Sequence, residues 1–129
     1  FVDTGDIAEV VVEALLDDAH SGKTYEITGP RALTFREVVR EIEAATSRPI
    51  TFQAVAQEDY NAAMKAAGLP GDYIWLFDYL FREVLSKPEN QTVTGDVEKV
   101  LGRPATDFTA YAKKTAASGI WDQTVPQSV

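Results

Sequence analysis

The side chains that could carry out acid–base chemistry are few, and their spacing does not match a common catalytic pattern. Two tyrosine–lysine pairs occur, Tyr60 with Lys65 and Tyr111 with Lys114. A lysine four residues after a tyrosine lies on the same helix face, where its positive charge lowers the tyrosine pKa. Neither pair has that spacing, so we interpret both tyrosines as packing residues.

The other reactive groups in the sequence also lack a recognisable partner. The chain has no cysteine, which excludes thiol chemistry, and His20 is its one histidine, which disfavours a histidine-based zinc site. His20 stands beside Ser21 at the end of a predicted helix, where we expect it to be a solvated cation. The carboxylates fall mainly on helix faces and caps, so no acid–base pair stands out. We therefore name no catalytic residue and no metal ligand.

Phosphate-binding patterns are missing from the sequence as well. It contains neither a G-x-G-x-x-G turn nor a P-loop, and its glycines stand at turns and helix ends. No segment therefore has a known pattern for holding a pyrophosphate. We expect no NAD(P) to bind these 129 residues by themselves.

Composition and charge are those of a globular protein. The 129 residues are 45% hydrophobic and 25% charged, which is enough for one domain with a core. The net charge of −8 disfavours nucleic acid and anionic membranes as partners, because both require clustered Lys and Arg. No apolar run approaches the roughly 20 residues that span a bilayer. We expect a cytoplasmic protein.

Two short alternating segments predict strands. Residues 25–28 alternate apolar and polar side chains, and Gly29 and Pro30 follow them. Residues 50–54 alternate in the same way. We therefore predict an α/β fold that is rich in helices and has a small sheet of two to four short strands.

Helices are predicted from apolar spacing and capping residues. Asp3 is expected to cap the first helix, with Asp6 adding charge to its positive end. Thr34 and Glu37 form a T-x-x-E capping box for the second. The remaining predicted helices cover residues 58–67, 73–85, 95–101 and 107–118, and the last three of these have Asp72, Thr94 and Thr106 as predicted caps.

The predicted helix at residues 73–85 is apolar around almost its whole circumference. In a chain of this length, such a helix is either a central core helix or has one face that meets a partner, a ligand or another domain. Both interpretations stay open at this point.

A set of ordered motifs resembles the NmrA-like, atypical short-chain dehydrogenase/reductase proteins. They are V-D-x-x-D-I-A at residues 2–8, Y-E-I-T-G-P at 25–30, A-L-T-F-x-E-V at 32–38 and R-P-I-x-F-x-x-V at 48–55. Residues 94–104 add a closing T-x-D-V-E-x-x-x-G-R-P, followed by a last helix. Each motif alone is weak, but the order is specific.

The resemblance implies a longer parent protein. Its N-terminal Rossmann half would bind NAD(P) and would precede Phe1, which stands where a complete chain has Met. The 129 residues would be the C-terminal substrate-binding lobe, with one domain at residues 1–122 and a flexible tail at 123–129. The substrate-pocket candidates that it implies are Gly29 and Pro30 at the rim of the cleft and Tyr73, Trp75 and Phe77 on the aromatic helix.

The resemblance also implies a function for the parent, NAD(P)-dependent oxidoreduction or epimerase-like chemistry on a small organic substrate, with this piece inactive alone. Two alternatives stay open: an NAD(P)-sensing regulator without turnover, and a self-standing interaction domain that docks through its aromatic helix. Surfaces shaped to meet a missing half would be exposed, so we expect a homo-oligomer.

Overall fold

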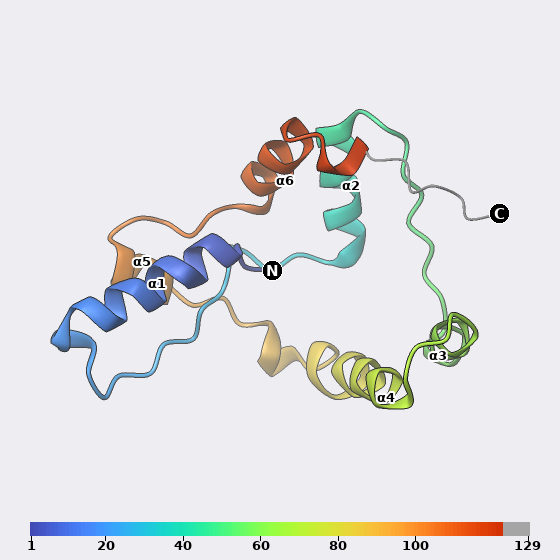
Figure 1. Ribbon diagram of the computed structural model, residues 1–129, viewed down its shortest axis with the longest axis horizontal. Helices are drawn as coiled ribbons and strands as arrows, with labels where there is room; N and C mark the ends of the chain where they lie inside the picture. Colours follow the sequence, from blue (N-terminus) through green and yellow to red (C-terminus); the bar gives the residue numbers. More distant parts are fainter. Residues whose placement is uncertain (123–129) are drawn as a thin grey trace. The chain divides into compact units, whose positions relative to one another are not determined.

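The computed structural model describes residues 1–122, and these are helical, with no β-strand among them (Figure 1). They form two compact units. The first unit comprises Phe1–Thr51 and the described part of Val93–Val129, and the second comprises Phe52–Thr92. The predicted tail at residues 123–129 lies outside the described residues, and the single domain at residues 1–122 stays a prediction.

The first unit pairs helices that are far apart in the sequence. Helix α1 (Thr4–Leu16) packs against α5 (Asp96–Leu101), and α2 (Phe35–Thr46) packs against α6 (Phe108–Ala117) (Figure 1). Short 3₁₀ turns follow α1 at Asp18–His20 and α6 at Ile120–Asp122. Each of the four α-helices contributes one side chain to the buried apolar core: Val10, Val38, Val97 and Ala112.

The predicted starts of α1 and α2 are confirmed. Asp3 caps α1, and its carboxylate accepts a hydrogen bond from the Gly5 amide at 2.7 Å. At α2 the capping box is complete: the Thr34 hydroxyl accepts from the Glu37 amide at 3.2 Å, and the Glu37 carboxylate accepts from the Thr34 amide at 2.7 Å. Local sequence alone specifies both helix ends.

The threonine caps predicted for the last two helices are wrong. The N-caps are Gly95 for α5 and Asp107 for α6, one residue later than predicted in each case. Both threonines bond instead to distant parts of the first unit, since the Thr94 amide donates to the Thr28 hydroxyl and Thr106 donates to Asp6. Each threonine hydroxyl therefore bonds to a residue that is distant in the sequence, although the local pattern predicts that it caps a helix.

The predicted sheet is also wrong for the described residues. Residues 25–28 belong to no strand, because side chains satisfy their backbone in place of a neighbouring strand. The Glu26 amide donates to the Asp96 carboxylate at 2.9 Å, and the Thr94 hydroxyl donates to the Glu26 carbonyl. Residues 50–54 likewise belong to no strand in the described part. Alternating apolar and polar side chains predict which side chains of a strand are exposed. They do not identify a second strand whose backbone would form the hydrogen bonds of a sheet.

The second unit is a helix pair with an irregular end. Helix α3 (Gln57–Ala66) packs against α4 (Gly71–Tyr79), and a π-helical turn (Leu80–Leu85) and a 3₁₀ turn (Pro88–Gln91) follow. Gly68, with φ of +78°, turns the chain between the two helices. Tyr60 and Phe81 pack edge to face between α3 and the π-helical turn, with ring centroids 5.7 Å apart.

The helix predicted at residues 73–85 is therefore longer than α4 and changes type along its length. Helix α4 begins at Gly71 with Pro70 as N-cap, so the predicted cap Asp72 is wrong and lies inside the first turn. The Asp72 carboxylate accepts from the adjacent Tyr73 amide at 3.1 Å. After Tyr79 the backbone widens into the π-helical turn, a feature that often marks functional sites.

Candidate functional site

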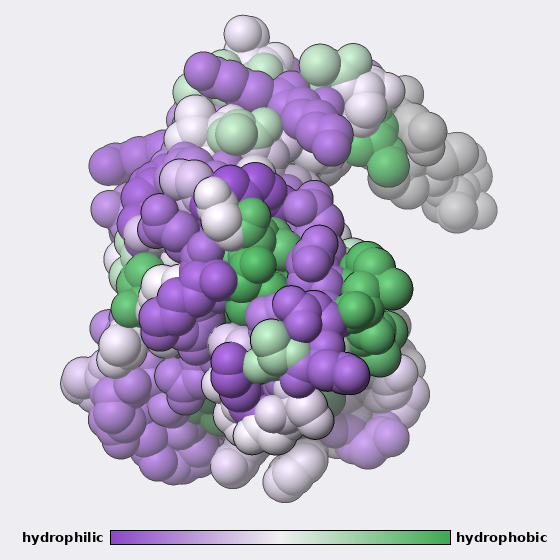
Figure 2. Space-filling view, turned by 90° about the vertical axis from the view of Figure 1, so that its left-hand side faces the viewer, coloured by the Kyte–Doolittle hydropathy of each residue, from purple (hydrophilic) through white to green (hydrophobic). Residues whose placement is uncertain are grey.

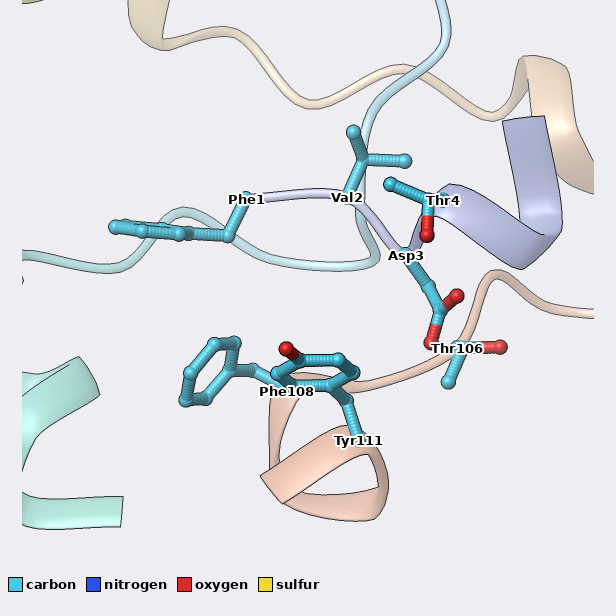
Figure 3. A pocket seen from close by; sticks show the side chains of 7 residues that line it. All are labelled: Phe1, Val2, Asp3, Thr4, Thr106, Phe108 and Tyr111. Carbon is cyan, nitrogen blue, oxygen red and sulfur yellow. The ribbon is translucent and has the colours of Figure 1, made fainter. Parts of the chain in front are cut away.

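A small pocket opens in the first unit between residues 1–4 and the start of α6. Figure 3 shows Phe1 facing Phe108 and Tyr111 across the opening, with Asp3 beside Thr106. Its volume is about 210 Å³. Pockets for whole ligands commonly measure about 300–1,000 Å³. This pocket can therefore accept a small group but not a dinucleotide.

The wall of this pocket is a series of packed aromatic rings. Phe1 stands edge-on to Phe35 and Phe108, with centroids 5.5 and 5.8 Å away. Phe108 is followed by Tyr111 at 5.6 Å, and Tyr111 by Trp121 at 6.3 Å. The predicted packing role of Tyr111 is confirmed. Of these rings, Phe1, Phe108 and Tyr111 line the pocket itself, and Tyr111 carries the one hydroxyl group among the three.

Next to the pocket, a buried carboxylate joins the start of α1 to the segment before α6. Asp6 is 1% exposed. It accepts from the Thr106 amide at 2.6 Å and from the Thr106 hydroxyl at 2.9 Å, and it lies 2.9 Å from a guanidinium nitrogen of Arg103. Arg103 also pairs with Glu9 at 2.6 Å. The sequence interpretation of Asp6 as a dipole-compensating helix residue missed this role.

Asp6 stays ionised in this setting. Burial alone would raise its pKa, but the hydrogen bonds from Thr106 and Arg103 outweigh burial and hold the pKa below 3.8. A carboxylate held in this form cannot donate a proton near neutral pH. Asp6 is therefore a structural anion, not a general acid.

A second charged cluster joins α2 to α6. The Arg31 guanidinium lies 2.6 Å from an oxygen of Asp107 and 2.6 Å from one of Glu41. The Thr109 hydroxyl donates to Glu41 at 2.9 Å. Hydrogen bonding to Arg31 holds the pKa of Asp107 well below its usual range, and its bonds to Asp107 and Glu41 raise the pKa of Arg31. These groups are paired with one another and do not point to proton transfer.

The single histidine is not freely solvated, so the expectation for it is wrong. His20 is half-buried, and its Nδ1 lies 2.7 Å from the Tyr25 hydroxyl, with the two ring centroids 5.6 Å apart. The pair closes the turn between α1 and residues 25–28. The contact between His20 and Tyr25 could not be predicted from their spacing in the sequence, because it depends on how the turn between them folds.

The glycine–proline pair proposed for the cleft rim lies in the first unit. Gly29 is buried, and a Cβ added to it would clash with the Phe1 carbonyl oxygen. Glycine is therefore needed here so that the N-terminal residues can pass close by. Pro30 is exposed. Neither lines the pocket of Figure 3, and their part in binding a substrate stays a prediction.

The three aromatic candidates lie in the second unit, on α4. Tyr73 and Trp75 are exposed, whereas Phe77 is half-buried. Tyr79, one turn after Trp75 on the same side of the helix, is also exposed, as is Leu76. The two groups of candidates thus belong to different units, and the role of the aromatic residues in a substrate pocket also stays a prediction.

A polar network joins α4 to α3. Asp78 accepts from the Asn61 amide group at 2.6 Å and from Arg82 at 3.0 Å, and Arg82 also pairs with Glu58 at 2.7 Å. The bond from Asn61 and then that from Arg82 lower the pKa of Asp78. The Asp78–Arg82 spacing of four residues is a helical ion-pair signal that sequence reasoning missed.

Metal-binding clusters and membrane-spanning helices are both missing from the described residues. Within residues 1–122, no three His, Asp or Glu side chains gather as a metal-binding group. In the same range, no helix has the length and apolar character needed to cross a bilayer.

Comparisons with known proteins relate the chain to reductases. It is 36% identical over 119 residues to an NAD(P)H azoreductase of Xenophilus azovorans, a match that covers 92% of this chain and 41% of that protein. It is 33% identical over 117 residues to the uncharacterized oxidoreductase YesF of Bacillus subtilis, covering 91% and 41%. A (4-alkanoyl-5-oxo-2,5-dihydrofuran-3-yl)methyl phosphate reductase of Streptomyces griseus is 28% identical over 121 residues, covering 89% and 40%.

These relatives confirm the coarser part of the resemblance. Along most of its length the chain is similar to an NAD(P)H azoreductase, an uncharacterized oxidoreductase and a reductase. It spans about two fifths of the length of these relatives. No protein-family model matches it.

Proposed function

We propose that the chain is the C-terminal, substrate-binding part of a longer NAD(P)H-dependent oxidoreductase of the NmrA-like type, acting on a small organic molecule. One observation carries the proposal: 92% of the chain aligns with an NAD(P)H azoreductase, yet the alignment covers 41% of that enzyme. The order of the motifs at residues 2–55 and 94–104 supports it. The proposed compartment is the cytoplasm.

In this proposal the nicotinamide cofactor binds outside the 129 residues, because those described do not fit it. The pocket of about 210 Å³ is too small for a dinucleotide, and the sequence has no glycine-rich turn to hold the pyrophosphate. The charged clusters around Asp6 and Arg31 are satisfied within the first unit. The chain alone is therefore inactive.

The open face of α1 supports the proposal of a longer protein. Leu15 and Leu16 are 80% and 79% exposed, and Val11 and Val12 are about half exposed. Figure 2 views the side of the molecule where α1 lies and shows apolar surface open between polar side chains. Such surface is usually covered. We propose that the cofactor-binding half packs here, and that the chain without that half self-associates into a homo-oligomer through the same face.

The coding sequence upstream of Phe1 provides the first test. The proposal expects a strand followed by a glycine-rich turn and a helix there. The longer protein should oxidise NADPH or NADH in the presence of a suitable small organic acceptor. The reaction is measured as the decrease in absorbance of the reduced nicotinamide. Cofactor binding without turnover across a broad acceptor panel would favour the regulator instead. An upstream sequence without a dinucleotide-binding pattern would contradict the proposal.

A further inference from the structure

The exposed face of α4 carries two aromatic rings stacked on each other. The rings of Trp75 and Tyr79 lie 5.7 Å apart between centroids, with an angle of 16° between their planes. They are one helical turn apart, and the two residues are 65% and 48% exposed. Leu76, three residues before Tyr79, extends this exposed face and is about half exposed. Parallel open rings of this kind are a surface on which another flat ring can stack.

The charge on this face is negative. Asp72 precedes Trp75 by three residues and Tyr79 by seven, so the α-helical repeat places its carboxylate on the same side, one turn before Trp75. Asp72 is exposed. The other charges nearby are engaged elsewhere in the second unit: Asp78 and Glu58 bond to Arg82, and Glu83 pairs with Lys87 at 3.1 Å. Of the charged residues near the stacked rings, Asp72 is the one that forms no ion pair within the described residues.

We infer that the exposed face of α4 binds a planar aromatic cation, which stacks on the Trp75–Tyr79 pair with its positive charge beside Asp72. Two independent attractions favour this ligand class. An aromatic cation stacks on an indole and gains a cation–π contribution as well, and its charge is complementary to the carboxylate. The inference rests on the proposed function and deepens it, since it names the substrate class that these candidate residues accept.

A protein partner fits this face less well than a small ligand. The three exposed apolar residues of this face, Trp75, Leu76 and Tyr79, offer roughly 300 Å², since aromatic side chains bury about 150–250 Å² each when fully covered. A stable interface needs about 800 Å² on each partner. A second copy of the chain would also bring another net charge of −8 and another Asp72 toward the face. A small cation pays neither cost.

Three matched probes test the inference on the 129-residue chain without any nicotinamide. They are 1-methylquinolinium, a cation; quinoline, neutral at pH 7.5; and naphthalene-1-sulfonate, an anion. Titrations followed by NMR should show the cation binding about 5–10-fold more tightly than quinoline, with the anion weakest, and shifts centred on α4. Trp75→Leu should weaken binding of the cation about 5–10-fold. Asp72→Asn should remove the preference for the cation while quinoline still binds.

Trp121→Leu is the matched control, since it removes the chain's other tryptophan in the first unit and should leave all three affinities unchanged. Equal affinities for the three probes, shifts centred on Trp121, or an α4 face already covered by a second copy in the free chain would each overturn the inference. Because no turnover is measured, such a result would leave the oxidoreductase proposal standing. If the longer protein shows no NAD(P)H turnover while the 129-residue chain still binds the probes as expected, the oxidoreductase proposal is overturned and the inference about α4 stands.

Discussion

The carboxylate of Asp6 and the backbone amide of Thr106 lie 2.6 Å apart, although 100 residues of sequence separate them. The Thr106 hydroxyl donates to the other oxygen of the same carboxylate at 2.9 Å. This contact fixes the beginning of α1 against the segment that leads into α6, and it lies beside the pocket of Figure 3. The fold of the first unit depends on a buried anion that is fully bonded.

Asp6→Asn should lower the free energy of unfolding by about 1.5–3 kcal/mol, because charged, buried hydrogen bonds contribute about that much. Thr106→Val removes the hydroxyl but keeps the amide, and it should cost about 1 kcal/mol. Urea denaturation followed by circular dichroism measures both. Glu98→Gln, which removes an exposed carboxylate from α5, is the matched control and should change stability by less than about 0.5 kcal/mol. Equal losses for the control and Asp6→Asn would contradict this role.

Stability should fall in acid. The pKa values of Asp6 and Asp107 both lie below the ordinary aspartate value in the folded protein. Such groups add stability that is fully present above the unfolded pKa, near about 3.9, and is lost as pH falls toward the folded pKa. The free energy of unfolding should therefore decrease as pH drops below about 4. A double Asp6→Asn, Asp107→Asn variant should show a shallower decrease, and an unchanged slope would contradict the assignment.

The capping box of α2 gives a prediction that depends on local structure alone. Thr34→Ala removes the hydroxyl that accepts from the Glu37 amide, and it should cost about 1 kcal/mol. Thermal melting with circular dichroism measures the loss. Thr24→Ala, at an exposed position outside any helix, is the control and should leave the melting temperature nearly unchanged. A melt of Thr34→Ala that matches the wild type would show that α2 does not need this cap.

Gly29→Ala should disturb the close packing of the Phe1 backbone against residue 29. A methyl group at Gly29 meets the backbone of Phe1, so one of the two segments must move, at a cost of about 1–3 kcal/mol. NMR chemical shifts should change around Phe1 and its ring partners Phe35 and Phe108. Gly71→Ala has open space around its added methyl and serves as the control. Unchanged shifts at Phe1 would contradict the close approach.

Helix positions were predictable from the sequence where the signals are local. The capping box at Thr34, the cap at Asp3 and the left-handed glycine after α3 all act within a few residues, and each is present in the structure.

Contacts between distant segments were not predictable in the same way. Thr94 and Thr106 look like caps in isolation, yet each bonds to residues more than 60 positions away. Residues 25–28 look like a strand, but no strand of the described chain lies beside them. The exposure of Leu15 and Leu16 depends on which segment covers α1, and helical periodicity does not identify that segment. The stacked pair Trp75–Tyr79 was visible only as part of an apolar helix.

Titration of NADPH by isothermal calorimetry tests the central claim most directly. The longer protein that contains these residues should bind NADPH, whereas the 129-residue chain alone should show no heat beyond dilution, because the described residues do not fit a dinucleotide. Tight binding of NADPH to the 129-residue chain by itself would contradict the account.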